Sequence, residues 1–180
     1  MKVKYCKDVF GKKNDFSKYH IKELVFNDFL LGDTKEFDKR KLSIINEKFH
    51  DPYLKCFGII ENNTLIYSTW INLRTLNLPM IKSKIKLDSN EGLLEDSYCH
   101  SAYRGLGLHT IMNKYRMSKL FEANKTQIIV IVIQGNIPAV KVQENCGFQI
   151  VGSFYLGKIF GVPITTFNKN KLDNRFNTVY

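Results

Sequence analysis

The stretch DSYCHSAYRGLGLHTIMNKYR, Asp96 to Arg116, places two glycines between a segment typical of a β-strand and one typical of an α-helix. Gly105 and Gly107 lack a Cβ, so a ligand can approach the backbone there closely. The following helix is indicated by apolar residues at helical spacing: Leu108, Ile111, Met112 and Tyr115. Its first N–H groups are unpaired and lie at the positive end of the helix dipole. The turn is therefore a predicted phosphate-binding site, with Arg104 adding positive charge.

Two common phosphate-binding motifs do not fit this turn. A dinucleotide-binding fingerprint requires a third glycine where this chain has Thr110. It also requires an acidic residue at the end of the next strand, where this chain has Gln134 and Gly135. A P-loop ends in Gly-Lys-Ser or Gly-Lys-Thr, and the sequence contains neither. The phosphates must therefore belong to another kind of ligand.

The segments around this turn alternate between strand and helix. Glu91 to Cys99 forms the predicted strand before the turn. Thr126 to Ile133, TQIIVIVI, ends in six consecutive β-branched residues, which predicts a strand buried on both faces. A short helix is predicted from Ile137 to Cys146, with Pro138 in its first turn and Gly147 as its C-terminal cap.

The glycine turn resembles the pyrophosphate-binding motif of the GNAT superfamily of acyl-CoA-dependent N-acyltransferases, which reads Arg/Gln-x-x-Gly-x-Gly/Ala. In LEDSYCHSAYRGLGLH, Leu94 to His109, Arg104 and Gly107 stand at the first and fourth positions. Ser101 replaces a common proline, and His109 stands where Gly or Ala is usual. The second difference matters little if that position supplies only a backbone N–H.

A second segment resembles another motif of the superfamily, Asn-x-x-Ala-x-x-x-Tyr-x-x-x-Gly-Phe. NIPAVKVQENCGF carries it from Asn136 to Phe148, with Ala139 and Gly147 in place and Gln143 where the tyrosine is usual. The two motifs occur in the expected order and flank the strand predicted to be buried. With the order of elements, the resemblance covers roughly residues 55–167.

The resemblance implies acetyl-CoA, or another short acyl-CoA, as acyl donor and co-substrate, and no metal. It implies that main-chain N–H groups bind the pyrophosphate, at Arg104, Gly105, Leu106, Gly107, Leu108 and His109. It also implies that the main-chain N–H of Cys99 stabilises the thioester oxygen, in a slot between two strands that splay apart. Asn136 is a further candidate contact, although it also fits a plain helix N-cap.

The implied reaction is direct attack by a primary amine on the thioester, which requires removal of a proton from the amine. Glu95 and Glu91 share one face of the predicted strand if that strand is regular, so both are candidate bases. Each is alternatively a solvated or salt-bridged carboxylate, and Asp96 is expected on the other face. Nothing marks the Cys99 thiol as an activated nucleophile.

The leaving thiolate lacks the usual proton donor. Many members of the superfamily use the tyrosine of the second motif, and Gln143 cannot give up a proton. Either another group serves or the thiolate leaves unaided. Tyr155, on a later predicted strand, is the candidate substitute, with core packing as its alternative role.

The whole chain, residues 1–180, is predicted to form a single GNAT-like domain. Asn62 and Asn63 tolerate positive φ and predict a two-residue hairpin turn. Leu76 to Asn90 is expected to be a basic loop. Helices are predicted at Phe16–Leu31 and Thr34–Phe49, and further strands at Lys2–Cys6, Lys55–Glu61, Thr64–Thr75, Phe148–Leu156 and Val162–Asn168.

The expected fold class is α/β (α+β). The sheet should be mixed, twisted and mostly antiparallel, with six to seven strands and about four helices on its faces. Its central parallel pair should be splayed.

The formal net charge of +10 favours an anionic partner. The basic residues are spread along the chain, which disfavours nucleic acid, although a basic module that binds nucleic acid or an acidic protein remains the alternative. No signal-peptide core and no apolar run near 18 residues is found, so no membrane association is expected. A reducing cytoplasmic location is expected because the four cysteines are widely spaced: Cys6, Cys56, Cys99 and Cys146.

The acceptor is expected to be a small-molecule amine. Lys82, Lys84 and Lys86 would attract an anionic one, such as a nucleotide-linked amino sugar, but a solvated lysine edge is the preferred interpretation. The missing tyrosine keeps a catalytically silent CoA-binding sensor as an alternative. The oligomeric state, monomer or homodimer, is left open.

Overall fold

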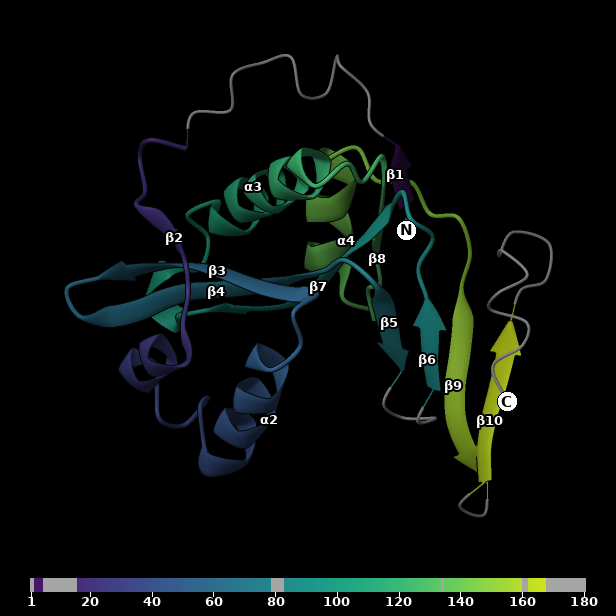
Figure 1. Ribbon diagram of the computed structural model, residues 1–180, viewed down its shortest axis with the longest axis horizontal. Coiled ribbons are helices and arrows are strands. Elements are labelled where there is room, and N and C mark those ends of the chain that lie inside the picture. Colours follow the sequence, from purple (N-terminus) through teal and green to yellow (C-terminus); the bar gives the residue numbers. More distant parts are fainter. Residues whose placement is uncertain (1, 5–15, 79–82, 134, 160–161, 168–180) are drawn as a thin grey trace.

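The computed structural model describes residues 2–4, 16–78, 83–133, 135–159 and 162–167. Six strands form one sheet in the order β1-β8-β7-β4-β3-β2 (Figure 1). They are β1 (Lys2–Lys4), β2 (Ile21–Glu23), β3 (Leu54–Glu61), β4 (Thr64–Asn72), β7 (Glu91–Cys99) and β8 (Gln127–Val130). Neighbouring strands are antiparallel except β7 and β8, which run parallel.

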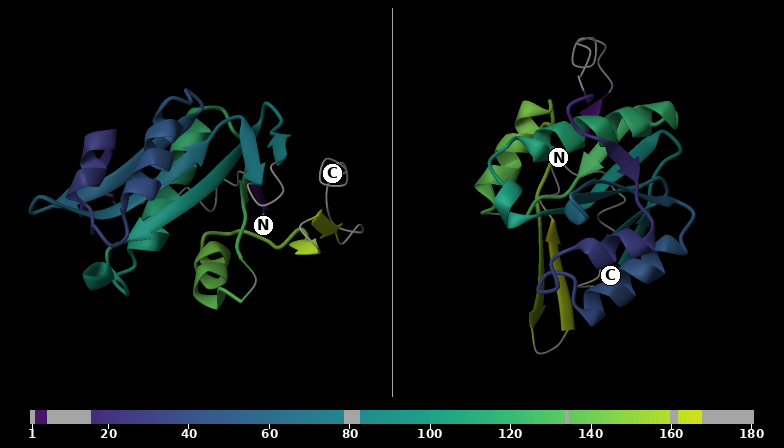
Figure 2. Two further views of the ribbon diagram at one scale, coloured as in Figure 1. Left: turned by 90° about the horizontal axis from the view of Figure 1, so that it is seen from below. Right: turned by 90° about the vertical axis from the view of Figure 1, so that its left-hand side faces the viewer.

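Helices cover both faces of this sheet. α3 (Leu108–Glu122) and α4 (Ile137–Asn145) lie on one face. The 3-10 helix η1 (Phe26–Leu31) and α2 (Lys39–Phe49) lie on the other, as Figure 2 shows. None of the helices that the structure describes is long and apolar enough to cross a membrane. This mixed, mostly antiparallel sheet between helices confirms the predicted fold class.

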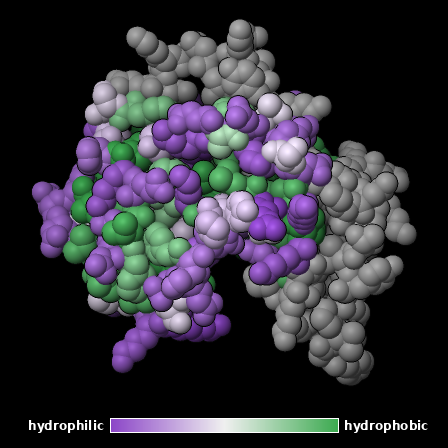
Figure 3. Space-filling model, in the orientation of Figure 1, coloured by the Kyte–Doolittle hydropathy of each residue, from purple (hydrophilic) through white to green (hydrophobic). Residues whose placement is uncertain are grey.

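Each face has its own apolar core. Under α3 the core includes Tyr67, Ile71 and Met112, and under η1 and α2 it includes Phe29 and Trp70, whose rings stack with centroids 6.1 Å apart. Some apolar surface remains outside, and Figure 3 shows it over η1, where Val25 and Leu30 are exposed.

Several predicted elements are confirmed. Asn62 and Asn63 form the β3–β4 hairpin turn with φ of 48° and 58°. α4 begins after Asn136, whose Oδ1 accepts a hydrogen bond from the Ala139 N–H at 3.2 Å. Gly147 follows it with φ of 87°, the left-handed conformation expected at a helix C-terminus.

The predicted helix at Phe16–Leu31 is wrong. The chain there forms β2 and then η1. Tyr19 and Ile21 pack against the α3-side core, whereas Leu24 and Phe29 lie in the α2-side core. The apolar face of one helix cannot pack against both faces of a sheet. The apolar spacing that resembles a helix therefore arises from the edge strand β2 and the chain that follows it into η1.

Other boundaries shift. α2 begins at Lys39 rather than near Thr34, because Asp38 caps it by accepting a 2.7 Å hydrogen bond from the Lys41 N–H. β8 ends at Val130, and Ile131 and Ile133 beyond it are exposed, so burial on both faces holds only for its first part.

Two hairpins lie outside the six-stranded sheet. β5 (Thr75–Leu78) pairs with β6 (Ser83–Lys86) inside the segment expected to be a loop, because Leu76, Leu78 and Ile85 bury their side chains. Lys84 and Lys86 are exposed, as expected of a solvated edge, and Lys82 lies outside the described residues.

The last hairpin joins β9 (Phe154–Ile159) to β10 (Val162–Phe167). β9 therefore starts six residues later than the predicted Phe148, whose side chain is instead buried in the α3-side core. Cys6 and Asn168, the last residues of two predicted strands, lie outside the described residues.

Candidate active site

β7 extends well beyond the end of its parallel neighbour β8. Their parallel pairing runs from Glu91 and Gln127 to Leu94 and Val130. β7 continues to Cys99 and is paired there only with β4. The predicted splayed parallel pair is thus present, and it leaves one edge of β7 open.

A β-bulge at Asp96 decides which groups face this opening. Thr69 is opposite Ser97 and Trp70 is opposite Glu95, so Asp96 is the extra residue, with φ of 29°. The His100 N–H donates to Ile66 O at 2.9 Å.

Donors alternate along an antiparallel strand, so the N–H groups of Cys99 and Ser97 point away from β4, into the opening. This agrees with the predicted role of Cys99. Ser97 was missed, because the bulge leaves no mark in the sequence. The Cys99 thiol is not activated, since burial raises its pKa.

The glycine turn forms an open cradle at the start of α3. Gly105 and Gly107 have φ of 82° and 77°, and Gly107 is the N-cap of α3. The N–H groups of residues 105–109 donate to no other described residue. A Cβ built on either glycine would meet nothing within 4 Å. Beside them, Arg104 Nε donates to Cys99 O at 3.2 Å. A turn with free amides and open space fits a diphosphate.

The side chain of His109 turns away from this cradle. Its Nδ1 lies 3.1 Å from the hydroxyl of Tyr67, and burial lowers its pKa to about 4, so the imidazole is neutral at pH 7. Burial also raises the pKa of Tyr67 to about 12. His109 therefore leaves its backbone N–H free, although it replaces the usual Gly or Ala.

The two candidate bases lie in different surroundings. Glu91 begins β7, is 2% exposed, and accepts a 3.0 Å hydrogen bond from the Asp88 N–H, which fixes a turn. Glu95 lies beside the bulge, where its Oε1 accepts from Asn72 Nδ2 at 3.2 Å. Its Oε2 is 3.9 Å from Lys48 Nζ. Burial raises the pKa of Glu95, and Lys48 and Asn72 oppose the rise.

The expectation that Asp96 points to the opposite face is wrong. Its Oδ2 lies 3.3 Å from Lys48 Nζ, the same ammonium that approaches Glu95. The bulge redirects this side chain, so two carboxylates share Lys48 of α2 on the face away from α3.

Gln143 is buried where the superfamily has its tyrosine. Its Oε1 accepts a 3.0 Å hydrogen bond from Asn113 Nδ2, and the Asn113 oxygen accepts from the Arg116 guanidinium. Arg116 also donates to Trp70 O at 3.1 Å and to Glu95 O at 2.8 Å. Sequence reasoning missed Arg116 because a buried arginine cannot be told from a surface one on a helix.

The remaining candidates are less constrained. Asn136 serves as an N-cap, and its cofactor contact stays a prediction. Tyr155 lies on β9 opposite Thr166, and its role also stays a prediction. In the part of the chain that the structure describes, no group of three or more His, Cys, Asp and Glu residues could hold a metal ion.

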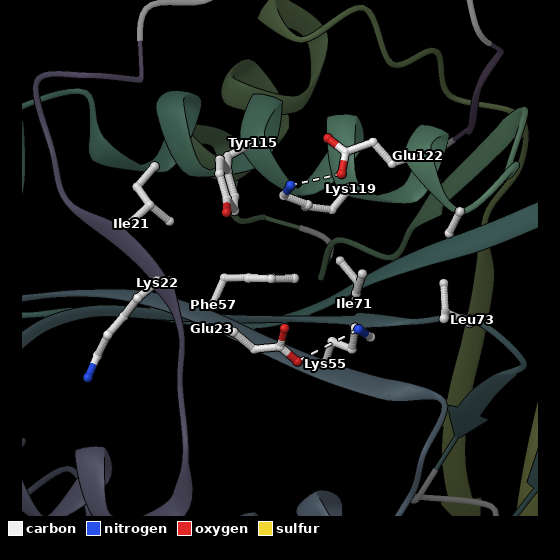
Figure 4. Close-up of a pocket in the computed structure, with 11 residues that line it drawn as sticks. Ile21, Lys22, Glu23, Lys55, Phe57, Ile71, Leu73, Tyr115, Lys119 and Glu122 are labelled. Atoms are coloured by element: carbon white, nitrogen blue, oxygen red, sulfur yellow. Dashed lines mark hydrogen bonds and ion pairs between the residues drawn. The ribbon is translucent and has the colours of Figure 1, made fainter.

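A separate cleft of about 420 Å³ lies between the C-terminal half of α3 and the edge of the sheet (Figure 4). Phe57 and Ile71 form its apolar floor, and Tyr115 points into it from α3. At its rim Lys119 pairs with Glu122 at 2.8 Å. None of the predicted site residues lines it, and the sheet separates it from Glu95.

Comparisons with known proteins find similarity in structure alone. No protein-family model matches the chain, and no curated protein matches it in sequence. An aminoglycoside antibiotic 6'-N-acetyltransferase from Acinetobacter haemolyticus is 16% identical, with a TM-score of 0.56 over 73% of this chain and 91% of that chain.

Two other solved structures give similar values. A ribosomal-protein-alanine N-acetyltransferase from Brucella melitensis biovar Abortus is 14% identical, with a TM-score of 0.57 over 78% of this chain and 98% of that one. A predicted acetyltransferase from Clostridium acetobutylicum, solved with acetyl-CoA, is 19% identical, with a TM-score of 0.50 over 73% of this chain and 90% of that one. The chain therefore has the GNAT fold, as its two motifs predict.

Proposed function

We propose that this protein is an N-acyltransferase that moves an acetyl or short acyl group from acyl-CoA to a primary amine of a small molecule. The amine attacks directly, with both substrates bound together. The observation that carries the proposal is the open glycine cradle, which lies next to a slot between β7 and β8 lined by free backbone N–H groups.

Acyl-CoA supplies the activated carbonyl, and the protein supplies the hydrogen bonds that hold and polarise it. The amides of residues 105–109 and Arg104 would hold the diphosphate. The amides of Ser97 and Cys99 point into the slot and are the donors for the oxygen that gains negative charge in the transition state. Rigid backbone donors need no rearrangement when this charge develops.

Glu95 is the proposed base. It is partly shielded from solvent, with 14% of its side chain exposed, and its pKa is raised by burial. A raised pKa brings a carboxylate closer to the working pH of a general base. Glu91 is the weaker candidate for the base. It lies four residues before Glu95 on β7, and its carboxylate already accepts the hydrogen bond from the Asp88 N–H that fixes a turn.

The acceptor is proposed to be a cationic amine such as an amino sugar. The carboxylates of Glu95 and Asp96 both lie near one ammonium, that of Lys48, so this group of three side chains has a net negative charge. Such a charge favours a positively charged ligand. The aminoglycoside acetyltransferase among the similar structures agrees with such an acceptor. A nucleotide-linked acceptor would need the lysines of β6.

The donor site is tested by thermal unfolding with and without acetyl-CoA. The wild type should be stabilised, and Gly107→Asp should lose this effect because a carboxylate then faces the diphosphate. Gly107→Asn is the matched control, since it has the same shape and tolerates positive φ but carries no charge. Equal stabilisation of wild type and Gly107→Asp would refute the cradle.

A turnover assay distinguishes an enzyme from a catalytically silent CoA-binding sensor. The sensor is the second candidate because position 143 holds glutamine in place of the usual tyrosine. Thiol release is measured with aminoglycosides, other amino sugars, polyamines, amino acids and an alanine-initiated peptide. Acyl transfer to one class identifies the acceptor. Binding of acetyl-CoA without turnover of any amine would favour the sensor.

A further inference from the structure

The two oxygens of the Glu95 carboxylate have different neighbours. Oε1 accepts a 3.2 Å hydrogen bond from Asn72 Nδ2 on β4. Oε2 lies 3.9 Å from Lys48 Nζ on α2, which is an ion-pair distance but too long for a hydrogen bond. One oxygen is therefore bonded to a neutral donor, and the other lies near a positive charge without being bonded to it.

The orientation of the Asn72 amide follows from the turn that it fixes. Its Oδ1 accepts hydrogen bonds from the backbone N–H groups of Arg74 and Thr75, at 3.0 and 2.9 Å. A backbone N–H only donates, so the atom that it meets must be the oxygen. The NH₂ of Asn72 is then the group that meets Glu95, and it can only donate. Because Asn72 is fully buried, this donor is in place before any substrate binds.

Two further contacts hold the Lys48 ammonium beside Glu95. It lies 3.3 Å from Asp96 Oδ2 and 5.0 Å from the centre of the Trp70 ring, over which it makes a cation–π contact. The bulge supplies the first contact, because it turns Asp96 to this face of the sheet. Asp96 has 51% of its side chain exposed, against 21% for Lys48 and 14% for Glu95. Asp96 therefore holds Lys48 from the solvent side.

The surroundings of Glu95 act on its charge in opposite directions. Burial raises its pKa and is the largest effect. Lys48 and the hydrogen bond from Asn72 lower the pKa, whereas the two neighbouring aspartates raise it. The charged groups around Glu95 come from α2, from the residues after it, from β7 and, through the other face of the sheet, from α3: Lys48, Asp51, Asp96 and Arg116.

We propose that Lys48 and Asn72 are positioning residues for the base: together they hold the Glu95 carboxylate in its ionised form, with Oε2 as the atom that takes a proton from the amine. A proton on Oε1 would weaken the hydrogen bond from Asn72, because an ionised oxygen accepts more strongly than a hydroxyl oxygen. Oε2 makes no hydrogen bond to Lys48 that a proton would disturb. This inference rests on the proposed function.

The acceptor enters as an ammonium and gives one proton to Oε2. Its nitrogen then forms a bond to the acyl carbon, while the C–S bond breaks and its electron pair stays on sulfur. The thiolate takes the second proton from the nitrogen, and Oε2 returns its proton to solvent. A carboxyl group that is already protonated cannot begin this sequence, so the charge of Glu95 sets the lower pH limit of turnover.

The first measurement is the titration of Glu95 by NMR in protein labelled with ¹³C at the side-chain carboxyl carbon of glutamate. Glu95→Gln identifies the signal. The midpoint should lie below pH 7 in the wild type and rise by about one pH unit in Lys48→Met, because a nearby opposite charge favours the ionised form. Lys48→Arg should restore it. Lys39→Met, an exposed change on the same helix, should leave it in place.

Asn72→Asp tests the other contact. An aspartate still accepts from the two N–H groups of the turn, but it presents a negative oxygen to Glu95 in place of a donor. The Glu95 midpoint should again rise by about one pH unit. Asn145→Asp adds the same charge at an exposed position of α4, on the other face of the sheet, and should not move the midpoint.

Turnover of an amine then shows whether this carboxylate serves the reaction. The acidic limb of kcat/KM against pH should move with the Glu95 midpoint. Lys48→Met should therefore be about tenfold slower than the wild type below the midpoint and equal to it well above. A merely structural role of Lys48 would lower kcat/KM by the same factor at every pH.

Each outcome decides. An equal Glu95 midpoint in the wild type, Lys48→Met and Asn72→Asp overturns this inference and leaves the proposed function standing. A wild-type midpoint above pH 7 overturns it without any variant. A midpoint that moves while the acidic limb stays in place overturns it as well, because Glu95 is then not the base. If no amine is turned over with acetyl-CoA, the proposed function fails and this inference fails with it.

Discussion

The Arg116 guanidinium donates a 2.8 Å hydrogen bond to the carbonyl oxygen of Glu95, the residue at which β7 loses its partner on β8. The same nitrogen donates to Trp70 O at 3.1 Å. These carbonyls lie on neighbouring strands beside the bulge, so one side chain of α3 holds the bulge in shape. The free amides and the carboxylate of the site both depend on that bulge.

Replacing Arg116 by methionine should destabilise the protein by about 3 kcal/mol, because two buried carbonyls and the Asn113 oxygen lose a charged donor. Urea denaturation measures the change. Arg40→Met is the control, since Arg40 is exposed on α2 and should shift stability by less than about 0.5 kcal/mol. Equal effects of the two substitutions would show that the buried contacts contribute little.

Features that depend on local chemistry could be read from the sequence. The paired asparagines, the helix N-cap and the glycines with positive φ each require a particular residue at a particular turn. The residues of the glycine cradle were predicted for this reason. The buried strand was predicted from its β-branched residues, although its exposed end was not.

Features that depend on contacts between distant segments could not be read in this way. Asp96 occupies a bulge because β4 pairs with β7 in a shifted register, and no local signal distinguishes it from Glu95. The partners of Arg116 lie 46 and 21 residues away in the chain. The apolar spacing around the edge strand β2 resembles that of a helix because residues of this segment bury side chains on both sheet faces.

Glu95→Gln should lower kcat about 100-fold at neutral pH if Glu95 is the base. The deficit should shrink at high pH, where the amine is already deprotonated. Thiol release measured across pH follows both effects. Glu36→Gln, an exposed change remote in sequence, should match the wild type. A deficit that is uniform with pH would assign Glu95 to positioning instead.

Ionisation of Glu95 should also make the stability of the folded protein depend on pH. The pKa of Glu95 is raised above its ordinary value of 4.5 in the folded protein, so ionisation destabilises the fold. The wild type should therefore lose stability relative to Glu95→Gln as pH rises above 4.5. Urea midpoints of both proteins between pH 4.5 and 7 show the difference. A constant difference would mean that folding leaves this pKa unchanged.

Cys99 should act through its main chain. Cys99→Ala removes the thiol and should keep kcat within about threefold, because the raised pKa leaves no reactive thiolate. Cys99→Pro removes the N–H that faces the slot and should lower kcat about 100-fold. Proline is tolerable there because this N–H makes no bond to β4.

The proline variant is informative only alongside a binding measurement. Stabilisation by acetyl-CoA should persist in Cys99→Pro, since the glycine cradle is intact, while turnover falls. Loss of activity in Cys99→Ala equal to that in Cys99→Pro would instead indicate that the thiol takes part in the reaction.

His109 should make the fold sensitive to acid. Its pKa falls from 6.5 to about 4 on folding, so the neutral form stabilises the protein fully above pH 6.5. This contribution is lost as pH falls toward 4, and it amounts to at most about 3 kcal/mol because the side chain is partly exposed. His109→Ala should flatten the decline of the urea midpoint over that range. His20→Gln, an exposed control, should decline like the wild type.

The same variant separates the side chain of His109 from its backbone. At pH 8 His109→Ala should still be stabilised by acetyl-CoA, because alanine presents the same N–H at a position where the side chain turns inward to Tyr67. Loss of that stabilisation in a variant that remains folded would show that the imidazole itself contacts the donor. The inward contact would then have to break on binding.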